Sequence, residues 1–158
     1  MPPYLIDGIL HYQLKQKMKT ALITGANRSI GLETAKQLSA KGVFIYLGSR
    51  NLENGEKAVK TLNEQGFQNI KAIEIDVTNP ESISTAKNMV ENEQGKLDIL
   101  INNAGILGNT PQQASDFSIQ EIQTIFDTNF FGVISVTQAF LDLLKKSDSP
   151  RISNNTSG

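Results

Sequence analysis

The sequence feature that most constrains the fold is a short apolar run followed by a glycine turn, at residues 19–31. The apolar residues 21–23 predict a strand, Gly25 ends it, and a helical pattern begins near Ser29. Gly25 allows a sharp turn, and Gly31 allows the helix to approach the strand and a ligand closely. The start of such a helix has unpaired N–H groups and the positive end of the helix dipole, so it favours an anion such as a pyrophosphate. The stretch predicts the first half of a βαβ unit, with an ordinary strand-to-helix turn as the alternative.

The rest of the chain alternates between strand and helix patterns. Continuous apolar runs such as residues 43–47 are typical of central strands in a parallel sheet, which are buried on both faces. After the first strand, the expected elements are a helix at 30–41, a strand at 43–47, a helix at 51–65, a strand at 70–75, a helix at 79–95, a strand at 97–101 and a helix at 118–146. This alternation predicts an α/β fold, a doubly wound parallel sheet of the Rossmann type, truncated after about five strands.

The composition of the 158-residue chain argues against several classes of function. A net charge of −1 leaves no basic excess that could neutralise the phosphates of a nucleic acid. There is no cysteine and a single histidine, His11, which excludes disulfides and thiolate chemistry and makes a metal site improbable. No apolar run reaches the ~18 residues of a membrane span. We therefore expect no nucleic-acid, membrane or metal partner, and a cytoplasmic location.

Three stretches carry a resemblance to a known family. Thr24-Gly25-x-x-x-Ser29-x-Gly31 resembles the Thr-Gly-x-x-x-Gly-x-Gly fingerprint of the short-chain dehydrogenase/reductase family, with Ser29 in place of the middle glycine. The stretch 102–105, Asn-Asn-Ala-Gly, is similar to the family motif that follows the fourth strand in all four positions. The stretch 129–132, Asn-Phe-Phe-Gly, resembles the carbonyl-reductase-like branch. The resemblance covers Lys19 to Gly158 and implies the N-terminal, cofactor-binding portion of an oxidoreductase.

The resemblance also suggests where the domain begins. In the family the fingerprint lies within a few residues of the N-terminus, which makes Met18 a natural start. The apolar residues before it are interrupted by Asp7 and Gly8, too broken a run for a secretory signal. We expect residues 1–17 to be an N-terminal extension outside the fold. Residues 18–158 are expected to form a dinucleotide-binding Rossmann domain that is incomplete at the C-terminus.

The expected cofactor is NADP rather than NAD. An NAD site usually places an acid after the second strand, whereas this chain has Arg50 there and Arg28 inside the glycine turn. Both arginines could bind a 2′-phosphate, and solvated surface charges are the alternative for each. The residues of the glycine turn expected to contact the dinucleotide are Gly25, Asn27, Arg28, Ser29, Ile30 and Gly31.

Further cofactor contacts are implied after the third and fourth strands. In the family, an acid followed by an apolar residue contacts the adenine ring, which here corresponds to Asp76 and Val77. The alternative for Asp76 is that it starts the turn into the next helix. Small residues after the fourth strand let the backbone reach the ribose, which assigns Asn103, Ala104 and Gly105 to the cofactor site.

Two residues correspond to catalytic positions of the family. Asn129 lies on the apolar stripe of the expected long helix, where we expect it to be buried and therefore partnered. The resemblance implies an active-site asparagine that binds a water in a proton relay. The alternative is an asparagine bonded to nearby backbone. Ser157 falls, by register, at the catalytic serine of the fifth strand.

The catalytic pair of the family, Tyr-x-x-x-Lys, does not occur in this sequence. None of the three tyrosines, Tyr4, Tyr12 and Tyr46, has a lysine four residues on. Two hypotheses follow: an NADP-dependent oxidoreductase of carbonyls or alcohols, present as a fragment, or a short dinucleotide-binding protein without catalysis. The substrate class in the first is a small molecule. We also expect self-association through the apolar stripe of the long helix and through the edge strand of the sheet.

Overall fold

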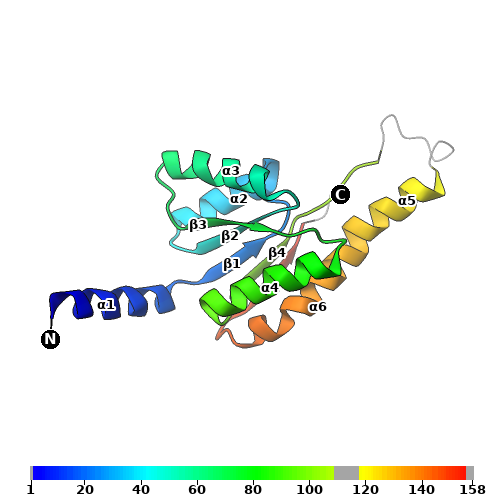
Figure 1. Ribbon diagram of the computed structural model, residues 1–158. Coiled ribbons are helices and arrows are strands. Elements are labelled where there is room, and N and C mark those ends of the chain that lie inside the picture. Colours follow the sequence, from blue (N-terminus) through cyan, green and yellow to red (C-terminus); the bar gives the residue numbers. More distant parts are fainter. Residues whose placement is uncertain (1, 109–117, 156–158) are drawn as a thin grey trace.

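The computed structural model describes residues 2–108 and 118–155, with side chains for all of these except residues 11–17. A five-stranded sheet forms the centre, all strands run parallel, and their order is β3-β2-β1-β4-β5 (Figure 1). The strands are β1 (Thr20–Ile23), β2 (Phe44–Ser49), β3 (Ile70–Glu74), β4 (Ile99–Asn102) and β5 (Arg151–Asn154). The order reverses beside β1, and ligands of such sheets bind at the carboxyl ends of the strands near this reversal. The prediction of a doubly wound parallel sheet is confirmed.

Helices cover both faces of the sheet. The helical elements are α1 (Pro3–Lys17), α2 (Ser29–Ala40), α3 (Leu52–Glu64), α4 (Pro80–Gln94), α5 (Ile119–Phe126), the π-helical turn η1 (Asp127–Phe131) and α6 (Gly132–Lys145). Helices α2 and α3 pack on one face, and α4 and α6 pack on the other (Figure 1). Within the part of the chain that the structure describes, no helix is both long and apolar enough to cross a membrane.

Alternate residues of β1 point into two separate cores. Leu22 packs in a cluster with Val90 of α4 and Phe140 of α6. Ala21 and Ile23 pack in a second cluster with side chains of α2 and α3. Burial on both faces explains why β1 is a continuous apolar run rather than an alternating one.

Two helix starts follow the local signals in the sequence. The Asn79 side chain accepts hydrogen bonds from the N–H groups of Glu81 and Ser82 at the start of α4. Ser118 and Glu121 form a capping box at the start of α5, in which each side chain bonds the backbone N–H of the other. These caps satisfy N–H groups that have no partner inside the helix, and so they fix where both helices begin.

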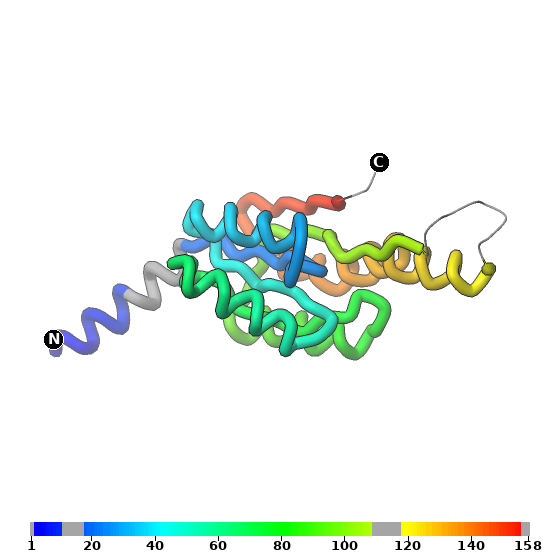
Figure 2. Tube along the Cα trace, turned by 90° about the horizontal axis from the view of Figure 1, so that it is seen from above, coloured from blue at the N-terminus to red at the C-terminus, as the bar shows by residue number. Residues whose placement is uncertain are grey.

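Helix α1 projects from the sheet (Figures 1 and 2). Its described side chains, those of residues 2–10, are all exposed, including Leu5 and Ile9. The segment that the sequence predicts to be an extension therefore forms a helix. The division into an extension at 1–17 and a domain at 18–158 stays a prediction.

The segment predicted as one helix at 118–146 contains a π-helical turn. Helix α5 passes into η1, where hydrogen bonds reach five residues back, and then into α6. The N–H of Gly132, for example, donates to the carbonyl of Asp127. A π turn shifts all later residues around the helix axis. The 3.6-residue period used for the prediction could not anticipate this shift.

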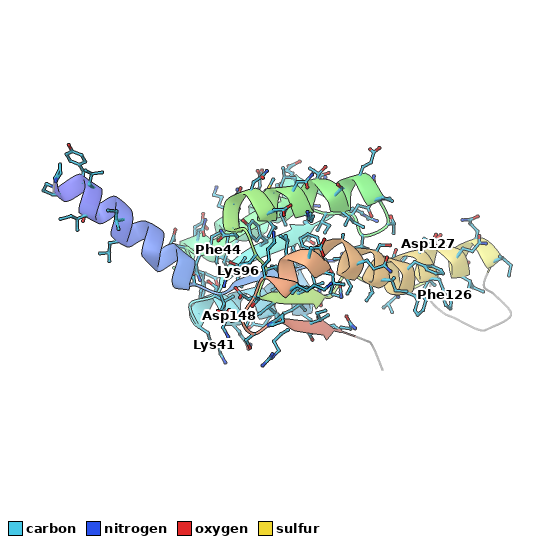
Figure 3. All side chains as sticks on the ribbon, turned by 90° about the horizontal axis from the view of Figure 1, so that it is seen from below. Lys41, Phe44, Lys96, Phe126, Asp127 and Asp148 are labelled. Carbon is cyan, nitrogen blue, oxygen red and sulfur yellow. The ribbon has the colours of Figure 1, made fainter. Side chains whose placement is uncertain are left out.

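The apolar stripe of the segment 118–146 is buried on α6 and exposed on α5 and η1. Val136 and Phe140 of α6 are fully buried against the sheet. Ile119, Phe126 and Phe130 are 71%, 52% and 54% exposed. Figures 1 and 2 show α5 extending beyond the sheet, and Figure 3 places Phe126 on this extension. The exposed half lies beyond the carboxyl ends of the strands, next to the candidate site.

A buried carboxylate lies at the opposite end of the sheet. Asp98 precedes β4 and accepts hydrogen bonds from the Thr20 N–H (2.9 Å), the Ser147 hydroxyl (2.5 Å) and the Lys96 ammonium (3.1 Å). Burial by itself would raise the pKa of Asp98. The three donors outweigh it and lower the pKa below its ordinary value of 3.8.

We expect Asp98→Ala to lower the free energy of unfolding by about 3 kcal/mol at pH 7, because buried donors lose their acceptor. The pKa of Asp98 is lower in the folded chain than in the unfolded one. Its stabilisation is therefore present above pH 3.8 and is lost as the pH falls through the folded pKa. Urea denaturation across this range measures both effects. Asp98→Asn should keep part of the stability and flatten the acid dependence, and unchanged stability of Asp98→Ala would contradict the assignment.

Candidate cofactor site

The ends of β1 and β4 are joined by the side chain of Thr24. This residue is buried, and its Oγ1 accepts hydrogen bonds from the N–H groups of Asn103 and Ala104, both at 3.0 Å. The N–H of Thr24 donates to the carbonyl of Ile101 at 3.0 Å. The two chain segments that leave the central strands are thereby fixed side by side at the carboxyl edge of the sheet.

The two glycines of the turn lie where a side chain would not fit. Gly25 has a φ of +61°, and a Cβ there would lie 2.7 Å from the Cα of Ala104. A Cβ on Gly31 would overlap the Nδ2 of Asn103 and would lie 2.8 Å from the Cα of Ala26. Both distances are shorter than real contacts, so each glycine is required by the packing of the turn against the segment that follows β4.

The start of α2 has no side-chain cap. Arg28 occupies the cap position, and its side chain makes no hydrogen bond to the first turn of the helix. The N–H of Leu32 donates to the carbonyl of Arg28, as the first bond of the helix. Among the described residues, no side chain accepts a hydrogen bond from the N–H groups of residues 29–31, and such an arrangement can receive an anion.

Ser29 has an unusual backbone conformation. Its φ is +51°, and no other described residue except glycines has a positive φ. This left-handed conformation costs an L-residue about 1–2 kcal/mol because the Cβ approaches the following carbonyl. The structure thus gives a physical reason for the glycine that the family fingerprint has at this position.

Ser29→Gly should raise the free energy of unfolding by about 0.5–1 kcal/mol, since relief of the left-handed strain exceeds the extra entropy of glycine. It also removes a Cβ beside the start of α2. Urea denaturation measures the effect. Ser29→Ala is the matched control, because it removes the hydroxyl and keeps the Cβ, and it should give no gain. A gain of equal size in both variants would show that the hydroxyl, rather than the backbone, is unfavourable.

The two arginines expected at the 2′-phosphate are exposed and free of ion pairs with the described residues. Arg28 lies in the glycine turn, and Arg50 directly follows β2, the strand next to β1. The buried Ser49 hydroxyl donates to the carbonyl of Asn51 at 2.7 Å and so shapes the turn that presents Arg50. Asn27 is half-buried, and Ile30 is 70% exposed. Both guanidinium groups remain available for a ligand.

The residues after β3 are engaged within the protein. The Oδ1 of Asp76 accepts hydrogen bonds from the N–H (2.9 Å) and the hydroxyl (2.7 Å) of Thr78. The turn role, given above as the alternative for Asp76, is therefore present. The side chain of Val77 is buried in the core. It packs so closely on Gly132 that a Cβ added to Gly132 would lie 2.8 Å from it. Only the backbone of Val77 is left to reach an adenine ring.

The expectation that Asn129 is buried is wrong. Asn129 is exposed, and its amide pairs with the backbone of one residue. The Ile106 N–H donates to its Oδ1 at 2.8 Å, and its Nδ2 donates to the Ile106 carbonyl at 2.9 Å. No described residue covers the apolar stripe of the helix at Asn129. Helical periodicity therefore predicted the correct face of the helix but could not predict whether that face is buried. Asn129 thus attaches η1 to the segment after β4. The other residue predicted at a catalytic position, Ser157, lies outside the described residues.

Two polar side chains at this edge were not expected to contribute. Thr24 entered the sequence analysis only as part of the fingerprint, although it joins the two strand ends. Asn155 follows β5, and its Nδ2 donates to the Oδ1 of Asn103 at 3.0 Å. No local signal in the sequence indicates the role of Asn155, because its partner lies 52 residues earlier in the chain.

The described part of the chain offers neither a tyrosine acid at the site nor a metal cluster. Tyr46 is fully buried, and its hydroxyl donates to the Oε2 of Glu93 at 2.7 Å. Burial, with a contribution from Glu93, raises the pKa of Tyr46 far above its ordinary value. Tyr46 is therefore a core residue. No group of three or more His, Cys, Asp or Glu side chains among the described residues could hold a metal ion.

Comparison with known proteins decides the family. Residues 19–158 match the family model described as short chain dehydrogenase. The chain belongs to this family. Short-chain dehydrogenases are oxidoreductases, and the resemblance predicted from the fingerprint and the Asn-Asn-Ala-Gly motif is confirmed.

Similar proteins include several reductases. Salutaridine reductase from Papaver bracteatum is 34% identical over 167 residues, covering 87% of this chain and 54% of that protein. The solved structure of salutaridine reductase from Papaver somniferum has a TM-score of 0.82 at 30% identity, covering 89% of this chain and 57% of that one. An actinorhodin polyketide ketoreductase variant solved with NADPH has a TM-score of 0.80 at 29% identity. The match covers 88% of this chain and 53% of that one. The chain spans about half the length of these short-chain dehydrogenases.

Proposed function

We propose that the chain binds NADP at the glycine turn and is the cofactor portion of an oxidoreductase that reduces small carbonyl compounds or oxidises alcohols. The observation that supports this best is the uncapped start of α2 beside two glycines that admit no side chain. A pyrophosphate at that point would accept from the free N–H groups of the first turn. The solved ketoreductase with NADPH, which shares the fold, is consistent with the proposal.

The charges beside the glycine turn favour NADP over NAD. Arg28 and Arg50 carry no ion pair to any described residue, and both are exposed. A 2′-phosphate would form charge-assisted hydrogen bonds with them, each contributing about 1.5–3 kcal/mol. A carboxylate would be needed to prefer the free 2′-hydroxyl of NAD. On this proposal Asn103, Ala104 and Gly105 border the ribose, and Asp76 and the backbone of Val77 border the adenine.

The chemistry proposed for the complete enzyme needs a proton donor in addition to the cofactor. NADPH, when bound, supplies a hydride to a carbonyl carbon. The residues described here bind and orient the cofactor, and Asn129 attaches the helix beside the site to the segment after β4. We propose that Asn129 and Ser157 contribute to proton transfer together with a Tyr-x-x-x-Lys pair encoded downstream. The tyrosine donates the proton, and the lysine lowers its pKa toward the working pH.

A second candidate function is a short protein that binds a dinucleotide without turning it over. It would need only the glycine turn and its neighbouring residues, and no Tyr-x-x-x-Lys pair occurs within the 158 residues. The genomic sequence beyond codon 158 distinguishes the two. An open frame that encodes this pair supports the oxidoreductase, and a stop codon followed by unrelated sequence supports the binding protein.

Gly105→Val tests the cofactor site at a position where the backbone leaves room for a Cβ. A Cβ on Gly105 would lie 3.5 Å from the Oδ1 of Asn129, an ordinary contact, and its φ is not positive. If the ribose lies against Gly105, the valine should raise the dissociation constant of NADPH at least about tenfold, or 1.4 kcal/mol. Gly8→Val in α1 is the matched control, because a Cβ there meets nothing within 4 Å. Unchanged NADPH binding by a folded Gly105→Val variant would contradict the placement.

The exposed half of the apolar stripe, which lies on α5 and η1, supports the further proposal that the chain self-associates. Phe126 and Phe130 form an edge-to-face pair with ring centroids 6.3 Å apart, and both rings are about half exposed. Strand β5 adds an edge with one neighbour in the described sheet. Size-exclusion chromatography should give oligomers for the parent chain and a smaller species for the pair Phe126→Glu and Phe130→Glu. A parent chain that elutes as a monomer and melts cooperatively would contradict this.

A further inference from the structure

The side-chain amide of Asn103 is bonded at both of its ends. Its Nδ2 donates to the carbonyls of Thr24 (3.1 Å) and Gly25 (3.0 Å), which belong to the glycine turn. Its Oδ1 accepts from the Nδ2 of Asn155 at 3.0 Å. An amide group is planar, so the direction of its oxygen is fixed once its nitrogen is bonded to two carbonyls. The position of the glycine turn therefore determines where Asn155 finds its acceptor.

Strand β5 is held to the sheet by its pairing with β4 and buries little side-chain surface. It lies at the edge of the described sheet beside β4, and all four of its residues are exposed. Its single apolar residue, Ile152, is 46% exposed. The carboxyl end of the strand is attached by the Asn155 N–H, which donates to the Asn102 carbonyl at 2.9 Å, and by two side-chain amide pairs. Because little apolar surface is buried, these hydrogen bonds provide a large share of what keeps the strand end in place.

The two amide pairs lead to different parts of the fold. Asn154 accepts from the Nδ2 of Asn102 at 2.8 Å, and that nitrogen also donates to Thr137 of α6 at 3.1 Å. This pair connects β5 to the helix layer. The pair of Asn155 with Asn103 connects β5 to the glycine turn instead. The bond between Asn155 and Asn103 therefore depends on the glycine turn, whereas the neighbouring bond between Asn154 and Asn102 does not.

We propose that Asn155 is a positioning residue that couples the end of β5 to the glycine turn through Asn103, so that a dinucleotide bound at the turn also orders the strand end. The inference rests on the proposed function, because it requires a ligand at the turn. A ligand that fixes the carbonyls of Thr24 and Gly25 fixes the Asn103 amide, and this stabilises the bond to Asn155. By linkage, ordering of the strand end must favour ligand binding by the same factor. Ser157 follows two residues after Asn155, so the coupling acts on the strand that leads to the proposed catalytic serine.

Residue-resolved hydrogen exchange with and without NADPH tests the coupling. In the parent chain, NADPH should slow exchange of the glycine-turn amides and of the Asn155 N–H, the latter about fivefold, the equivalent of one hydrogen bond of ordinary strength. The Arg151 N–H, bonded to the Asp98 carbonyl at the other end of β5, is an internal reference and should not change.

Three variants separate coupling from simple support of the strand. Asn155→Ala should keep the NADPH effect at the turn and lose it at the strand end. Asn103→Asp keeps an acceptor for Asn155 but cannot donate to the turn, so it should lose the effect at the strand end as well. Asn154→Ala is the matched control, since it weakens the strand in both states and should leave the increase caused by NADPH intact.

Three outcomes would overturn the inference, and they differ from one another. If Asn155→Ala retains the full NADPH effect at residue 155 while the turn is protected, the coupling is absent and the proposed function stands. If NADPH protects neither the turn nor the strand in the folded parent chain, the proposed cofactor site is wrong and the coupling is wrong with it. Loss of the NADPH effect in Asn154→Ala as well as in Asn155→Ala would show that Asn155 only supports the strand.

Discussion

Replacing Arg50 with aspartate should reverse the cofactor preference of the chain, from NADP to NAD. Arg50 is exposed directly after β2, and its guanidinium has no carboxylate partner among the described residues. The replacement removes an attraction for the 2′-phosphate, adds a repulsion, and supplies an acceptor for a free 2′-hydroxyl. The ratio of the two dissociation constants should change by about two orders of magnitude, or about 3 kcal/mol. NADPH and NADH titrations followed by nucleotide fluorescence measure this ratio.

Two other arginines provide the controls for Arg50. Arg28→Gln should weaken NADPH binding more than NADH binding, because only NADPH carries the 2′-phosphate. Arg151→Asp should change neither, since Arg151 begins β5 at the amino end of the strand, away from the carboxyl edge. Equal affinities of the parent chain for NADPH and NADH would show that Arg28 and Arg50 are only surface charges.

The 158-residue chain should consume no NADPH with small ketones or quinones above a control without protein. Hydride transfer without a proton leaves an alkoxide, and a positioned general acid typically contributes about 10²–10⁴-fold to the rate. Tyr46 cannot supply the proton, because it is fully buried and burial raises its pKa. A serine hydroxyl such as that of Ser157 is not an acid near neutral pH.

The matching positive experiment extends the chain through its downstream reading frame. If the frame encodes a Tyr-x-x-x-Lys pair, the longer protein should reduce carbonyls with NADPH. Changing that tyrosine to phenylalanine should abolish the reaction while NADPH still binds. Robust turnover by the purified 158-residue chain would contradict the proposal and would require an acid among the residues present.

Local signals predicted the elements well because each depends on neighbours in the sequence. Continuous apolar runs gave the strands, and Asn79 and Ser118 gave two helix starts because a cap bonds the turn that directly follows it. The need for glycine at positions 25 and 31 was also predictable, because a sharp turn after a central strand requires the backbone to pack closely. The prediction of the family followed from two short motifs at the right distance from each other.

The parts that could not be predicted depend on contacts between distant segments. The helical pattern placed Asn129 on the correct face, but only the fold shows that nothing described covers that face and that Ile106 is the partner. The left-handed φ of Ser29 could not be predicted either, because serine has no preference for that conformation. The bond between Asn155 and Asn103 joins residues 52 apart in the sequence, which no local pattern indicates.

The most direct test of the central claim, that this chain binds NADP at its glycine turn, is isothermal titration calorimetry of NADP and NAD into the parent chain and into Gly105→Val. We expect one NADP to bind per chain, more tightly than NAD, and we expect binding to be at least about tenfold weaker in the variant. A folded parent chain that gives no binding heat with either dinucleotide, or that binds both equally and is unaffected by the valine, would contradict it.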